Sequence, residues 1–70
     1  MRLDPAVRVA MKIAHEDGLD PESVRELYEK MVLGEITIES MLQGIYNKLS
    51  DEGLKNTFST ITSNLVSFRS

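Results

Sequence analysis

Apolar residues recur at helical spacing in four successive stretches of the chain. The first stretch follows Asp4-Pro5, an N-cap residue followed by a proline suited to the first helical position. Four apolar residues then follow the i, i+3, i+4, i+7 pattern of one helix face: Val7, Ala10, Met11 and Ala14. This spacing predicts a helix from Pro5 to Glu16, ended by Gly18.

This first predicted helix is apolar over more than half of its circumference. Val9 and Ile13 lie on a face that adjoins the main stripe. A helix with two apolar sides is expected to pack on its own domain with one side and on something else with the other.

The second and third stretches repeat the same design. Asp20-Pro21 begins a helix that should run to about Leu33, where Gly34 ends it. Thr37 is the predicted N-cap of the third helix, with Ile36 before it as part of a hydrophobic staple. Gly44 interrupts this third helix at a cost of about 1 kcal/mol relative to alanine. It either lets another backbone approach or weakens the helix.

The fourth stretch follows a turn and a new N-cap within residues 50–53. Its apolar residues are spaced by 4, 3, 4 and 3, which is a heptad-like seam: Leu54, Phe58, Ile61, Leu65 and Phe68. A fourth helix is therefore predicted. The segment is also rich in Ser and Thr, which form helices poorly, so a strand or a frayed tail stays an alternative.

These patterns predict an all-α protein, a small three- to four-helix bundle. Its 70 residues fit one domain, with a helical core in residues 1–49 and a C-terminal helix or partner-dependent tail in residues 50–70. The predicted core comprises Val24, Leu27, Tyr28, Met31, Ile38, Met41, Leu42, Ile45 and Leu49.

Composition argues against several classes of function. The chain has no cysteine and one histidine, His15, and it carries no phosphate-binding loop or hydrolase motif, so we expect no enzyme, metal site or cofactor. His15 fits a surface residue near a helix C-terminus. The longest apolar runs are three residues, too short for a membrane span. The first residues lack the apolar region of a signal peptide, which favours a cytoplasmic protein.

Charge is distributed unevenly along the chain. Residues 1–15 hold three basic residues and one acidic residue, whereas residues 16–39 hold two basic and eight acidic residues. An acidic middle makes nucleic acid an improbable ligand, because phosphate binding needs clustered Lys and Arg. It suits a basic protein partner, or else it only solvates a helix face.

Two connections in the chain carry a family resemblance. They are Gly18-Leu19-Asp20-Pro21 and Gly34-Glu35-Ile36-Thr37, on either side of an amphipathic helix and before a further apolar helix. Over about residues 6–49 this arrangement resembles the VbhA-like antitoxins, three-helix proteins that silence Fic-domain AMP-transferases. The resemblance implies a Fic-type toxin as partner.

The same resemblance makes Glu16 the candidate inhibitory residue. The family's inhibitory glutamate pairs with an arginine that the toxin needs for the γ-phosphate of ATP, and a carboxylate–guanidinium pair suits that role. The family motif has Ser or Thr four positions before the glutamate and Gly or Asn directly after it. Lys12 and Asp17 stand at those positions here.

The sequence thus favours a non-enzymatic protein that binds and inhibits or masks a larger partner. The predicted partner contacts are Val7, Val9, Met11, Ile13, Phe58, Ile61, Leu65 and Phe68. One alternative is an adaptor that forms a homodimer through the C-terminal seam. A further one is a helix-turn-helix DNA-binding protein with residues 37–49 as the recognition helix, which has one basic residue, Lys48, on that helix.

Overall fold

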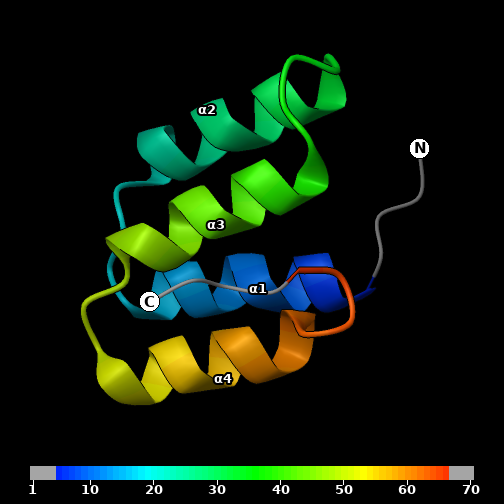
Figure 1. Ribbon diagram of the computed structural model, residues 1–70. Coiled ribbons are helices and arrows are strands. Elements are labelled where there is room, and N and C mark those ends of the chain that lie inside the picture. Colours follow the sequence, from blue (N-terminus) through cyan, green and yellow to red (C-terminus); the bar gives the residue numbers. More distant parts are fainter. Residues whose placement is uncertain (1–4, 67–70) are drawn as a thin grey trace.

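Four helices make up the computed structural model, which describes residues 5–66 (Figure 1). The helices are α1 (Pro5–Glu16), α2 (Pro21–Val32), α3 (Ile38–Lys48) and α4 (Glu52–Thr62). Consecutive helices run in opposite directions (Figure 1). The predicted all-α helical bundle is confirmed, and the strand alternative for the fourth stretch is wrong.

Helices α2, α3 and α4 begin where capping residues were predicted, whereas the cap predicted for α1, Asp4, lies outside the described residues. The Asp20 carboxylate accepts a hydrogen bond from the amide two residues later at 3.4 Å, and Pro21 occupies the first turn. Thr37 Oγ1 and Asp51 Oδ1 each accept a hydrogen bond from the amide three residues later at 3.0 Å. These side chains satisfy amide groups that the first turn of a helix leaves unpaired.

Two glycines end helices in the left-handed backbone conformation. Gly18, after α1, and Gly34, after α2, both have φ of 80°. A side chain at this φ costs about 1–2 kcal/mol, so glycine is the residue suited to both turns. The positions of these two glycines therefore set the lengths of the first two helices.

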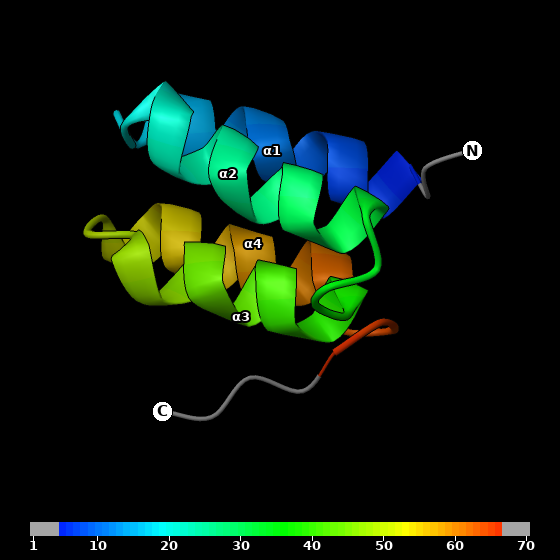
Figure 2. The same cartoon turned by 90° about the horizontal axis from the view of Figure 1, so that it is seen from above.

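Helices α1 and α3 each contact all three other helices, whereas α2 and α4 do not contact each other. The most extensive contacts join α1 to α4 and α2 to α3. Figure 2 shows the bundle from a second direction, with α1 and α2 on one side and α3 and α4 on the other.

All four helices contribute to one hydrophobic core. Five of the nine predicted core residues are buried: Met31, Met41, Leu42, Ile45 and Leu49. The other four, on the same predicted stripes, are half-buried and pack against this core: Val24, Leu27, Tyr28 and Ile38. Helices α1 and α4 complete it with Val7, Ala10, Ile13, Ala14 and Phe58.

This packing corrects three of the predicted partner contacts. Val7 and Phe58 are fully buried and Ile13 is 5% exposed, so all three belong to the chain's own core. The reason is that α4 packs along α1 and covers one of its two apolar sides. Most of the apolar surface of α1 is thus buried within the molecule.

Helix α4 is shorter than its apolar seam predicts. It ends at Thr62, and Leu65 lies in the turn that follows, with its amide donating to the Thr62 carbonyl at 2.9 Å. The Thr62 hydroxyl is buried and donates to the Phe58 carbonyl at 2.8 Å, a bond within the helix that is typical of threonine. Phe68 lies outside the described residues.

Gly44 admits a side chain from the neighbouring helix. A Cβ at this position would lie 3.3 Å from Leu27 Cδ1, and Leu27 belongs to α2. Of the two possibilities left open for Gly44, a close neighbour or a weakened helix, the structure shows a close neighbour, which is a leucine side chain and not a backbone. Gly44 helps α2 and α3 pack closely, against its intrinsic cost within a helix.

Candidate partner-binding surface

The side of α1 that points away from the core carries a shallow hollow. This hollow has a volume of about 360 Å³ and is lined by Pro5, Arg8, Val9 and Lys12. Val9 is 41% exposed, although it lies in the middle of the helix. Val9, a predicted partner contact, is thus accessible in the folded chain.

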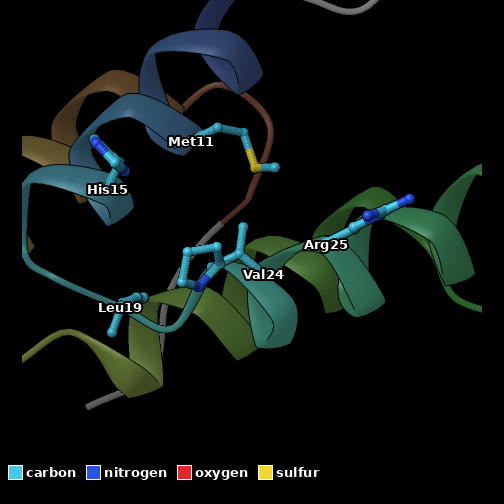
Figure 3. Close-up of a pocket in the computed structure, with 6 residues that line it drawn as sticks. Met11, His15, Leu19, Val24 and Arg25 are labelled. Carbon is cyan, nitrogen blue, oxygen red and sulfur yellow. The ribbon is translucent and has the colours of Figure 1, made fainter.

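A second hollow lies between α1 and the start of α2 (Figure 3). It is a groove of about 190 Å³, and its walls are mainly apolar. Met11 extends from α1 toward α2, and Val24 extends from α2 toward α1 (Figure 3). The residues that line the groove are Met11, His15, Leu19, Pro21, Val24 and Arg25.

The two hollows share one side of α1. Arg8 and Met11 are three residues apart, as are Lys12 and His15, and residues at this spacing are neighbours on a helix surface. We call the combined surface the α1–α2 face. It comprises Pro5, Arg8, Val9, Met11, Lys12, His15, Leu19, Pro21, Val24 and Arg25.

The α1–α2 face is basic on a chain whose formal net charge is −3. Among the residues that the structure describes, no carboxylate lines either hollow. Within residues 5–66, Arg8 and Lys12 form no ion pair, and both are exposed. Arg25 pairs with Glu29 at 2.9 Å, but both side chains are largely exposed, so this pair holds Arg25 only weakly.

A group of acidic residues lies on the exposed side of α2. A shallow polar hollow there is lined by Asp20, Glu22, Ser23, Arg25, Glu26 and Glu29. Two of these carboxylates have a cation four residues away: Glu29 pairs with Arg25, and Glu26 pairs with Lys30 at 3.6 Å. The acidic middle of the sequence is thus partly neutralised within its own helix.

Glu16, the candidate inhibitory residue, is exposed at the C-terminal end of α1. Its carboxylate makes no ion pair within the described part of the chain. It lies four residues after Lys12, which places it next to the α1–α2 face on the helix surface. The fold therefore leaves this carboxylate accessible to another molecule.

Asp17, the next residue, has a structural role that sequence reasoning missed. Its carboxylate accepts hydrogen bonds from the Ser50 amide at 3.1 Å, the Ser50 hydroxyl at 3.3 Å and the Asp51 amide at 3.0 Å. The two backbone hydrogen bonds, from Ser50 and Asp51, lower the pKa of Asp17 below its usual 3.8. Asp17 thus ties the end of α1 to the start of α4.

The remaining predicted contacts, Met11, Ile61 and Leu65, are all half-buried and pack against the core, and Met11 also lines the groove.

The structure also exposes two apolar residues at the end of α2 that the sequence pattern did not select, with Val32 45% and Leu33 72% exposed. The helical period alone did not single out these residues, because Leu33 follows the last turn of α2.

Between residues 5 and 66, no three His, Asp or Glu side chains gather closely enough to hold a metal ion. His15 is exposed, as its position near a helix end predicts. In the same range, no helix is both long enough and apolar enough to cross a bilayer.

Comparisons with protein-family models, curated protein sequences and solved structures find no match to this chain.

Proposed function

We propose that this chain is a non-enzymatic protein that binds a larger partner protein through the α1–α2 face and thereby masks it. One observation carries the proposal: the side of α1 that the bundle leaves uncovered combines an apolar groove with the exposed cations of Arg8 and Lys12. Apolar contacts with a polar rim are the usual composition of a protein interface.

The partner that we propose is a Fic-domain AMP-transferase in the cytoplasm, with the chain acting as its antitoxin. The resemblance to VbhA-like antitoxins supports this choice, and so does the accessible carboxylate of Glu16 at the end of α1. Glu16 would pair with an arginine that the enzyme needs for ATP. Asp17 is engaged with Ser50 and Asp51, so Glu16 is the better placed of the two carboxylates.

The experiment is an AMP-transfer assay with a Fic-domain enzyme from the same genome. We expect the added chain to suppress transfer, and Glu16→Gln to restore it while the complex still forms. Glu35→Gln is the matched control, because Glu35 is also exposed but lies in the turn after α2. Full AMP transfer with the unaltered chain in excess would refute the antitoxin proposal.

The packing favours neither alternative function. The helices of a helix-turn-helix motif cross steeply, whereas α2 and α3 lie side by side in opposite directions (Figure 1). A homodimer through the C-terminal seam would need Phe58 at its centre, and Phe58 is fully buried within one chain. Sedimentation of the purified chain over a range of concentrations checks the homodimer directly.

A further inference from the structure

The geometry of the α1–α2 face points to the chemistry of its occupant. We infer that this face receives an acidic amphipathic helical segment of the partner, whose apolar side chain enters the groove and whose carboxylates meet Arg8 and Lys12. The inference rests on the proposed function, because it names the part of the partner that the same face recognises.

The size of the groove fits a side chain of a larger molecule. Its volume is about 190 Å³, whereas pockets for drug-sized molecules measure roughly 300–1,000 Å³. The face extends along α1 from Pro5 to His15, which corresponds to about 15 Å of helix. A helix of about ten residues can lie along such a length and anchor one or two apolar side chains.

The charges select an acidic occupant. Arg8 and Lys12 are exposed and have no carboxylate partner within residues 5–66, and no carboxylate lines either hollow. An acidic segment would therefore gain favourable charge contacts here without displacing an existing ion pair. A basic segment would meet two like charges at the same place.

The neighbouring charges favour a narrow segment over a broad anionic surface. Glu22, Glu26 and Glu29 lie on the exposed side of α2, next to the groove through Arg25. A lipid bilayer or a nucleic acid would extend over these carboxylates and be repelled by them. A single helix placed along α1 avoids them and meets one carboxylate beside the face, that of Glu16 at the C-terminal end of α1.

The test uses three synthetic peptides of about twelve residues, which share apolar residues at the i, i+3, i+4, i+7 positions. Their remaining positions are Glu in the first peptide, Gln in the second and Lys in the third. Each is titrated into the full-length chain at low salt, with binding followed by fluorescence anisotropy. We expect the dissociation constant of the Glu peptide to be at least about tenfold lower than that of the Lys peptide. This difference should shrink at high salt.

The site of binding is mapped with variants and with amide chemical shifts. Arg8→Glu and Lys12→Glu should each weaken the Glu peptide about tenfold, whereas Lys48→Glu should leave its affinity unchanged. Lys48 is the matched control, because it is an exposed lysine on α3 outside both hollows. The largest shift changes should fall on Met11, Leu19 and Val24.

Several results would overturn the inference. They are equal affinity for the Glu and Lys peptides, an equal loss with Lys48→Glu, and equally strong binding of the chain to phosphatidylserine vesicles. Dimerisation that occupies the same face at the concentrations used would also overturn it.

The two proposals can fail separately. If the Fic-domain enzyme is inhibited equally well by the Arg8→Glu and Lys12→Glu variants, the antitoxin proposal survives and the acidic-segment inference fails. If the Glu peptide binds as expected but AMP transfer is unaffected, the acidic-segment inference survives and the antitoxin proposal fails.

Discussion

Asp17 shows how one side chain joins parts of the chain that are far apart in sequence. Its carboxylate lies at the end of α1 and accepts three hydrogen bonds from Ser50 and Asp51, directly before α4. Asp51 in turn caps α4 through its own carboxylate. The contact therefore positions the start of the helix that supplies Phe58 to the core.

Replacing Asp17 should test this contact. Asp17→Asn removes the charge and one acceptor oxygen, so we expect a lower midpoint of thermal unfolding. Glu16→Gln is the control, because Glu16 is exposed and makes no ion pair within residues 5–66. Circular dichroism at 222 nm measures both melting curves. Equal midpoints for the two variants would contradict the structural role of Asp17.

The same contact predicts a dependence of stability on pH. The folded chain holds the pKa of Asp17 below its ordinary 3.8, so the folded state favours the ionised carboxylate. The contribution of Asp17 is therefore complete above the ordinary pKa and is lost as the pH falls through the lowered pKa. Acid titrations of the unaltered chain and of Asp17→Asn should differ in that range. Superimposable titration curves would show that Asp17 adds nothing.

Residues that act within their own turn could be predicted, whereas Asp17 could not. The caps at Asp20, Thr37 and Asp51 bond to amides two or three residues away, so a local pattern reveals them. Asp17 meets its partners 33 and 34 residues later. No local pattern specifies which distant amide a carboxylate will meet.

At the scale of elements, α4 depends most on its packing. Its sequence contains several Ser and Thr residues, which favour helix weakly, and its buried side chains are Phe58 and Thr62. Short helices of this kind are marginal in isolation and take their stability from an apolar face packed on other helices. The contact between α1 and α4 should therefore control whether α4 forms.

A substitution at Phe58 tests this dependence. Phe58→Ala should cost about 3–5 kcal/mol, because it leaves a cavity in the middle of the core. Thr60→Ala, on the exposed side of α4, should change the free energy of unfolding by less than about 0.5 kcal/mol. Urea denaturation gives both values. A loss at Phe58 no larger than that at Thr60 would place Phe58 outside the core.

The extent of the helices was predictable wherever glycine or a cap marks the end. Gly18 and Gly34 end α1 and α2 near the expected positions, and Asp51 begins α4. The end of α4 was not predictable in this way, because the apolar spacing continues to Leu65 while the helix stops at Thr62. Apolar spacing indicates a common face, and residues in a following turn can reach that face too.

For the whole molecule, the choice of which helices pack against each other determines which side of α1 remains exposed. Helices α1 and α4 are first and last in the described chain, and they pack together. The packing of α2, α3 and α4 on α1 buries Val7 and Ile13, and it leaves Arg8, Val9 and Lys12 exposed. Because a chain this small buries only a modest core, the loss of any one helix is expected to destabilise the other three.

A chain that ends at residue 49 should therefore fail to fold cooperatively. Without α4, the core loses Phe58 and the helix that packs on α1 and α3, and a domain this small is marginally stable even with its full core. Thermal unfolding followed by circular dichroism should change from a sharp transition to a gradual slope. A sharp transition at the original midpoint would show that α4 is an appendage.

The sequence by itself determined that the chain is helical, where its helices begin, and which residues are apolar on each, because these properties depend on neighbours within a turn or two. The tertiary structure decided which apolar side of α1 is covered by α4 and which forms a groove with α2. It also decided that Asp17, a residue far away in sequence, holds Ser50 and Asp51 at the start of α4 in addition to the local cap by Asp51. These outcomes depend on contacts between distant segments, and the free energy of such contacts is defined only once all four helices pack together.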